Sequence, residues 1–296
     1  MAVLSRSKKL RSDVLVRLNQ AASVARALAL AYGIVLILAV ALEDHLVFWP
    51  VKYPGGNWAT GPLAIEDLFL NSADGTRIHG WYLPHEDLIA TVLFLHGNDG
   101  NVTDWYAQLW NLHHSTGVSV LAIDYRGYGK SEGRPSEAGL LMDACAARDW
   151  LAKKEAIHRN EVVLMGRSLG GGIAVQLAAD TQPRALVLER TFTSLPDAAG
   201  ACYPFLPTRW FMRNRFDSQS AVANYLGPLL QSHGTADRIV PYGQAQRLFA
   251  LAPGRKKQFI SVAGGGHHSP QPDGYYRRVR EFLLSVDAAD RAASGD

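Results

Sequence analysis

Cysteine is scarce in this chain, with Cys145 and Cys202 the only two among 296 residues. They form no C-x-x-C pair, and the H-E-x-x-H pattern of zinc peptidases is absent. The sequence therefore offers neither a redox dithiol nor a zinc site of these kinds, and we expect no metal and no cofactor. The spacing of the two cysteines leaves a disulfide open but does not establish one.

An excess of basic residues is also missing from the chain after residue 42. The whole chain has a net charge of +3, yet residues 1–42 contain six basic residues and one acidic residue. The rest of the chain then has 24 basic and 26 acidic residues, which gives −2. We therefore expect no nucleic-acid partner for this part of the chain.

Charge is nearly absent from residues 24–42, where Arg26 is the one charged side chain. As a helix this segment is about 28 Å long, close to the hydrocarbon thickness of a bilayer. We predict a basic amino-terminal segment at 1–23, a transmembrane signal anchor at 24–42 and a linker at 43–64. The alternatives are a buried core helix and a signal peptide cleaved after the small residues at 39–41.

The flanks of this segment predict its orientation. Basic residues precede it, whereas Glu43 and Asp44 follow it. By the positive-inside rule the amino terminus lies in the cytoplasm. We therefore expect a single-pass membrane protein whose main domain is on the non-cytoplasmic side.

Strand-like apolar runs alternate with helical patterns over the predicted domain at 65–290. Asp74-Gly75 joins the first two runs as a hairpin, and the later runs are continuously apolar, as in a parallel sheet covered on both faces. We predict an α/β fold with a mostly parallel central sheet flanked by helices. Strands are expected at 65–70, 77–83, 91–95, 119–123, 161–165, 185–188, 228–232 and 258–262, and helices at 102–114, 137–154, 170–180, 242–251 and 274–286.

An interval after the sixth strand is long for a single crossover helix, at about forty residues. It is rich in aromatic residues and is punctuated by prolines. We predict a small helical insertion at 192–226 over the carboxyl edge of the sheet. Phe205, Trp210 and Phe211 are candidates for the wall of an acyl or aryl pocket. The alternative is that these aromatic side chains pack the insertion onto the body of the domain.

The pentapeptide G-R-S-L-G at 166–170 follows an apolar run and precedes a glycine-rich helix start. This pattern is typical of a nucleophile elbow, a sharp strand-to-helix turn that exposes a serine hydroxyl. A second G-x-S-x-G surrounds Ser131, but it follows a turn-rich segment, and Pro135 prevents a helix from starting there. We therefore predict Ser168 as the nucleophile and a loop around Ser131.

A serine nucleophile needs a histidine as base, and in α/β hydrolases the chain order is serine, acid, histidine. After Ser168 the remaining histidines are His233, His267 and His268. His233 precedes the best acid. We predict His267 as the base, because the three glycines before it let its ring approach the serine, and His268 as a neighbour.

The predicted acid is Asp237, in a loop at the end of a buried strand. Loops held by the rigid end of a sheet commonly carry functional groups. Asp217 and Glu189 are the competing acids. For the oxyanion we expect two backbone N–H donors, one from Leu169 and one from Asn98 in the loop after the third strand. We expect His96 to be structural.

Several short motifs follow one another along the chain: His96-Gly97-Asn98, the segments 124–131 and 166–171, Phe192-Thr193-Ser194, His233-Gly234 with Asp237, and Gly265-Gly266-His267. Together they resemble the membrane-anchored α/β-hydrolase-domain proteins of eukaryotes and their bacterial relatives. The resemblance covers about residues 65–285, and the amino-terminal anchor is also similar. It implies the α/β-hydrolase fold and a serine hydrolase with Ser168, Asp237 and His267 as its triad.

Two departures from that family lie near the expected site. His268-Ser269 stands where members often carry Asn-Asp, and Arg190-Thr191 stands where they often carry Ser-Pro. Some eukaryotic members remove palmitate from proteins, but these departures prevent a transfer of the substrate to this chain.

The leading hypothesis is a serine hydrolase that cleaves a carboxylic ester or thioester of a small-molecule or acylated substrate through an acyl-enzyme. A serine aminopeptidase of the same fold is the alternative among enzymes, although the insertion offers only Asp197 and Asp217 to hold a free amine. A non-catalytic membrane scaffold is the alternative from another class.

Overall fold

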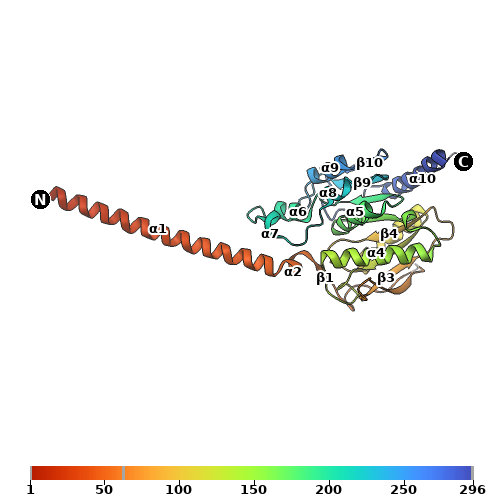
Figure 1. Ribbon diagram of the computed structural model, residues 1–296, viewed down its shortest axis with the longest axis horizontal. Coiled ribbons are helices and arrows are strands. Elements are labelled where there is room, and N and C mark those ends of the chain that lie inside the picture. The colour runs from red at the N-terminus through yellow and green to blue at the C-terminus, as the bar shows by residue number, and fades with distance from the viewer. Residues whose placement is uncertain (1, 62–63, 295–296) are drawn as a thin grey trace. The chain divides into compact units, whose positions relative to one another are not determined.

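The computed structural model describes residues 2–61 and 64–294, so Met1 and residues 62–63 of the expected linker lie outside the described residues. The chain divides into two compact units, Met1–Leu46 and Val47–Asp296. The first unit is mainly helical, and the second contains all of the strands (Figure 1).

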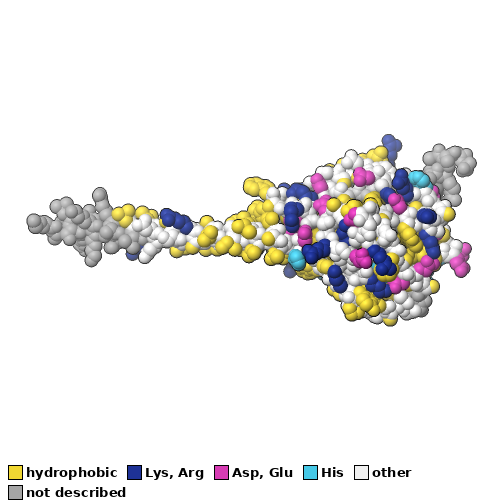
Figure 2. Space-filling model, turned by 60° about the horizontal axis from the view of Figure 1, so that its bottom comes forward, with side chains coloured by type: hydrophobic (Ala, Val, Ile, Leu, Met, Phe, Trp, Pro, Cys, Tyr) yellow, Lys and Arg dark blue, Asp and Glu magenta, His cyan; other side chains and the backbone are white. Residues whose placement is uncertain are grey.

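Helix α1 (Ala2–Ala41) is continuous and is followed by the short α2 (Glu43–Val47). Within α1, the stretch Arg17–Ala41 contains an 18-residue window with a mean hydropathy of 2.3, and none of that window is buried inside the protein. Hydrophobic side chains cover most of the described part of this helix (Figure 2). A helix that is apolar all round has no single face to pack on a core. Among the residues that the structure describes, one helix is thus long and apolar enough to cross a membrane.

The second unit is built on an eight-stranded sheet in the order β10-β9-β8-β7-β4-β6-β3-β2. β2 pairs antiparallel with β3, and β3 pairs antiparallel with β6, whereas the other neighbours are parallel. The predicted α/β class with a mostly parallel sheet is confirmed. The strands are β2 (Glu66–Asn71), β3 (Arg77–Leu83), β4 (Ala90–Leu95), β6 (Val118–Asp124), β7 (Val163–Arg167), β8 (Leu186–Glu189), β9 (Leu229–Gly234) and β10 (Lys257–Val262).

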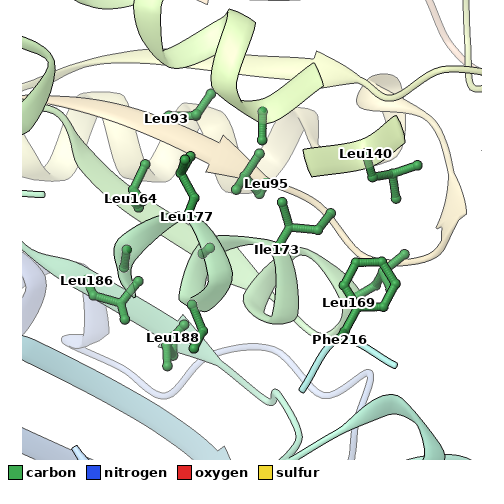
Figure 3. Close-up of a cluster of buried hydrophobic side chains, with 14 of the residues drawn as sticks. Leu93, Leu95, Leu140, Leu164, Leu169, Ile173, Leu177, Leu186, Leu188 and Phe216 are labelled. Carbon is green, nitrogen blue, oxygen red and sulfur yellow. The ribbon is translucent and has the colours of Figure 1, made fainter. Parts of the chain in front are cut away.

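Helices cover both faces of this sheet because the central strands alternate their apolar side chains between two cores. In β4, Leu93 and Leu95 join a core with Ile173 of α5, whereas Val92 and Phe94 join a core with helices α3 and α10. Figure 3 shows the first of these cores. α4 (Glu137–Lys154), α5 (Leu169–Thr181), α8 (Ser218–Val222) and α9 (Tyr242–Leu251) contribute to it, and α3 (Tyr106–Thr116) and α10 (Tyr275–Ser294) contribute to the second.

Leu93 is completely buried at the centre of the sheet, so its loss tests the first core. Leu93→Ala is expected to lower the free energy of unfolding by about 2–5 kcal/mol, because the substitution removes apolar contacts and leaves a cavity. The partly exposed Leu88 is the matched control, and Leu88→Ala should change the free energy of unfolding by about 0.5 kcal/mol or less. Denaturant titration of the full chain in detergent measures both. Equal effects of the two substitutions would contradict this packing.

Part of the expected linker packs on the domain. Val47 and Phe48 are buried, and β1 (Trp49–Pro50) pairs in parallel with β5 (Asp99–Gly100), just after β4. Two apolar side chains and a run of backbone hydrogen bonds hold this segment. As a result, the chain enters the domain beside the loop that follows β4.

The interval after β8 contains three short helices before the chain enters β9. They are α6 (Leu195–Cys202), α7 (Thr208–Phe211) and α8. Ser194 caps α6 by accepting a hydrogen bond from the Asp197 N–H, and Pro196 lies in its first turn. α6 and α7 pack on one another. These helices occupy the interval in which an insertion was expected.

Candidate active site

Ser168 lies on the sharp turn between β7 and α5, with φ 51° and ψ −117°. A positive φ is unusual for a residue with a side chain and is typical of strained turns at functional sites. The flanking glycines make the turn possible. A Cβ on Gly166 would lie 2.3 Å from the Gly170 carbonyl oxygen, and a Cβ on Gly170 would lie 2.0 Å from that of Leu95. The local geometry is that of a nucleophile elbow.

His267 and Asp237 form a continuous hydrogen-bond chain with this serine. His267 Nε2 lies 2.9 Å from Ser168 Oγ, and His267 Nδ1 lies 2.7 Å from Asp237 Oδ2. The histidine follows β10, and the aspartate follows β9, so adjacent parallel strands deliver both side chains to the carboxyl edge where β7 ends. The structure therefore brings together the three residues that the sequence predicted would meet.

The carboxylate of Asp237 is fixed in its orientation. Its Oδ1 accepts hydrogen bonds from the N–H groups of Ile239 and Val240, both at 2.9 Å. Burial alone would raise the pKa of Asp237, but the hydrogen bond and charge of His267 and the backbone donor outweigh burial, so this pKa lies below its ordinary value. An ionised carboxylate at this position holds the proton of the imidazole on Nδ1 and leaves Nε2 to accept a proton from the serine.

The two expected oxyanion donors come from the first residue of α5 and from the loop after β4. Leu169 is the first residue of α5, so its N–H has no acceptor within the helix. The loop after β4 contacts the serine, since a Cβ on Gly97 would lie 3.8 Å from the Ser168 Cβ. The Asn98 side chain donates to the Val47 carbonyl at 2.9 Å, and its own carbonyl accepts from Tyr128 and Trp49. These contacts involve the side chain and the carbonyl of Asn98, so the backbone N–H of this residue stays the expected second donor.

The rival residues have structural partners. Ser131 is buried and donates to the Asp124 carbonyl at 2.6 Å, Asp217 caps α8, and Glu189 lies beside the Arg167 guanidinium at 3.5 Å. His233 is buried beside Asp237, and it donates from Nε2 to the Val240 carbonyl.

His96 and His268 also lie outside the hydrogen-bond chain of Ser168, His267 and Asp237. His96 is buried against Tyr125, with ring centroids 4.5 Å apart, and burial lowers its pKa. His268 is exposed, with its ring edge-to-face on that of His267.

Two buried arginines hold the loop of the candidate base, and sequence reasoning missed them. Arg167 Nη2 donates to the His267 carbonyl at 3.0 Å, and Arg190 Nη1 donates to the same oxygen at 3.2 Å. Arg190 Nη2 also donates to the Pro270 carbonyl at 3.0 Å. One available signal was the Arg190-Thr191 departure from the family pattern. Thr191 Oγ1 donates to the Ser168 carbonyl at 2.8 Å, so both departing residues support the elbow or the histidine loop.

Loss of these bridges should displace His267. We expect Arg190→Met to lower kcat/KM on p-nitrophenyl esters by about tenfold to a hundredfold, because small displacements of a reacting group are costly. Arg190→Lys should not restore the rate, since an ammonium cannot bridge two carbonyl groups with the same fork. Arg278→Met, on the exposed side of α10, is the control. Steady-state rates equal to wild type in both Arg190 variants would show that the bridge is dispensable.

The aromatic residues expected to line an acyl pocket are distributed differently. Phe205 and Trp210 are largely exposed, and Phe211 is half-buried. Trp210 borders an open depression of about 350 Å³ formed by α6, α7 and the turn between them, and neither Ser168 nor His267 lines it. In this structure Phe205 and Trp210 therefore do not form the wall of an enclosed pocket at the serine.

Comparison with known proteins agrees with the fold and with the sequence resemblance. Residues 90–214 match the family model of the alpha/beta hydrolase fold. An uncharacterized protein of Mycobacterium tuberculosis is 36% identical over 245 residues, covering 82% of this chain and 86% of that protein. The alpha/beta hydrolase domain-containing protein WAV2 of Arabidopsis thaliana is 33% identical over 276 residues, covering 83% and 89%.

A solved esterase of Pyrococcus furiosus has the same fold, with a TM-score of 0.68 and 20% identity, covering 81% of this chain and 97% of the esterase. This likeness bears on the fold alone, whereas the sequence relatives extend over most of both chains. The chain therefore belongs to the family of alpha/beta-hydrolase-domain proteins that includes WAV2.

Proposed function

We propose that this protein is a membrane-anchored serine hydrolase that cleaves a carboxylic ester or thioester through an acyl-enzyme on Ser168. The observation that supports this most strongly is the hydrogen-bond chain from Ser168 through His267 to Asp237, at 2.9 and 2.7 Å, with the serine on a strained elbow. A non-catalytic scaffold does not require a strained serine aligned with a histidine and an aspartate, whereas nucleophilic catalysis does.

In the first half-reaction Ser168 Oγ attacks the substrate carbonyl while its proton moves to His267 Nε2. Asp237 stabilises the resulting imidazolium, and the N–H groups of Leu169 and Asn98 receive the negative oxygen of the tetrahedral intermediate. The intermediate collapses by expelling the alcohol or thiol, which takes the proton from His267. In the second half-reaction water repeats the sequence, releases the carboxylic acid and returns the proton to the serine.

An ester or thioester is favoured over a peptide by the state of the acidic residues in the insertion. A peptidase acting at a free amino terminus needs a carboxylate to bind the ammonium group. Asp197 is already bound by Arg209 at 2.6 Å and by Thr193 at 2.8 Å. Asp217 caps α8 through Ser220.

A substrate panel tests the reaction class. The full-length protein in detergent should hydrolyse p-nitrophenyl esters and acyl thioesters and should leave aminoacyl p-nitroanilides almost untouched. Faster release of p-nitroaniline than of p-nitrophenol would instead identify a peptidase. Absence of turnover from protein that binds no fluorophosphonate would support the scaffold alternative.

The anchor is a separate proposal, with α1 crossing the membrane once and the hydrolase domain on the non-cytoplasmic side. It is supported by the apolar stretch Arg17–Ala41 and by the basic residues before it. The protein should remain in the membrane pellet through a carbonate wash with its amino terminus intact. A reporter fused after Asp296 should score as non-cytoplasmic. A soluble form that begins near Leu42 would show cleavage instead.

A further inference from the structure

The helical insertion carries three exposed aromatic side chains close together in sequence. Tyr203 is 50% exposed, Phe205 is 63% exposed and Trp210 is 89% exposed. The first two rings lie edge-to-face with centroids 6.3 Å apart, and α6 and α7, which flank them, pack on one another. Side chains of this kind are usually buried for most of their area. We refer to Tyr203, Phe205 and Trp210 as the aromatic face.

Exposed basic residues follow the aromatic face closely in the sequence. Residues 198–216 contain Arg209, Arg213 and Arg215 and no acidic residue, and all three arginines are exposed. The side chain of Arg209 is 69% exposed although it binds Asp197, whose own side chain is nearly buried. Aromatic rings beside exposed arginines are typical of surfaces that lie in the headgroup region of a bilayer, where anionic lipids complement the charge.

The segment between the apolar stretch of α1 and the domain is too short to let the domain move far from a membrane that holds α1. The apolar stretch of α1 ends at Ala41, and the domain begins at Val47. Six residues extend over about 20 Å at most. With α1 in a membrane, the domain therefore remains close to that membrane, and even a weak contact with lipid is reinforced by this tether.

The tethered end of the domain lies at the edge that carries the candidate active site. Asn98, in the oxyanion loop, donates to the Val47 carbonyl, and Trp49 pairs with Asp99 in the same loop. The insertion also reaches this edge, because the Cys202 thiol lies 3.6 Å from the carbonyl of Ile239, two residues after Asp237. Both segments thus lie next to loops that hold the candidate site.

We propose that the aromatic face inserts into the headgroup region of the bilayer that holds α1. The contact turns the edge with Ser168 toward the lipid, so that a substrate whose acyl chain is held in the bilayer reaches the serine from the membrane. The second statement rests on the proposed serine hydrolase activity, whereas the lipid contact itself does not.

Depth-dependent quenching tests the contact. An environment-sensitive fluorophore is attached at Phe205→Cys or Leu226→Cys in full-length protein that also carries Cys145→Ser and Cys202→Ser. Leu226 is a matched control, since it is 71% exposed and lies before β9, at the amino edge of the sheet. The protein is reconstituted in vesicles of phosphatidylcholine with a minority of phosphatidylglycerol.

Lipids with a spin label near the headgroup should quench the fluorophore at position 205 and not at 226, and aqueous iodide should do the reverse. Equal quenching at the two positions would overturn the proposal. Shielding of position 205 from both quenchers would also overturn it, because a protein partner or a second copy would then cover the face. Because Ser168→Ala should give the same quenching pattern, the contact is tested independently of catalysis.

Kinetics test the delivery of substrate. The measured quantity is a ratio, the rate on a long-chain ester in the vesicles divided by the rate on a soluble short-chain ester. In Trp210→Ser this ratio should fall about tenfold, the size expected for one lost aromatic anchor. An unchanged ratio would contradict delivery from the membrane. Hydrolysis of neither ester by protein that shows lipid quenching would refute the proposed function and leave the contact standing.

Discussion

Replacement of Ser168 by alanine is expected to lower kcat/KM on p-nitrophenyl esters by about four to six orders of magnitude, the loss seen when a serine nucleophile is removed from an intact triad. The physical reason is that the Ser168 hydroxyl lies on the elbow, 2.9 Å from His267 Nε2. Among the contacts described for the chain, no other hydroxyl is hydrogen-bonded to that nitrogen. Stopped-flow or end-point release of p-nitrophenol measures the change, with circular dichroism to verify folding.

Ser131→Ala is the control for this experiment, because Ser131 lies in the other G-x-S-x-G. Its hydroxyl donates to the Asp124 carbonyl and accepts from the His79 N–H, so the substitution should reduce stability while the hydrolysis of esters continues. A variant at 131 that is folded and inactive, beside an active variant at 168, would overturn the assignment of the nucleophile.

The second large effect concerns the base and the acid. His267→Ala should be nearly as inactive as Ser168→Ala, because residues of a triad act as a unit. Asp237→Asn should lower the rate by about 10⁴-fold, since an amide favours the wrong imidazole tautomer. Initial rates across a series of substrate concentrations measure both losses.

His268→Ala is the matched comparison for the base. The two rings are neighbours, with centroids 5.3 Å apart, but His268 is exposed and His267 is the one bound to Asp237. Its removal should leave most of the activity. If His268→Ala were the inactive variant and His267→Ala were active, the register of this loop would differ from the one described.

The sheet was largely readable from the chain because its strands are continuous apolar runs. The third strand, expected at 91–95, is observed as Ala90–Leu95, and the eighth, expected at 258–262, is observed as Lys257–Val262. The meeting of Ser168, Asp237 and His267 was also predictable, because parallel strands bring their carboxyl ends to one edge.

Other features depend on contacts between distant segments and left little local signal. Arg167 and Arg190 converge on one carbonyl 100 and 77 residues further along the chain. The exposure of Trp210 could not be read from its sequence neighbourhood either, since an aromatic residue among prolines fits a pocket wall and a surface equally well. Such features are decided by which surfaces the fold leaves uncovered.

The most direct test of the central claim is to locate a fluorophosphonate adduct by mass spectrometry on the full-length protein. Trypsin separates the two candidates, because Ser168 begins a peptide after Arg167 and Ser131 begins another after Lys130. The account predicts one adduct, on Ser168 in the peptide that ends at Arg184, and its loss in His267→Ala. An adduct on the peptide that begins at Ser131, or active protein with no adduct on Ser168, would contradict it.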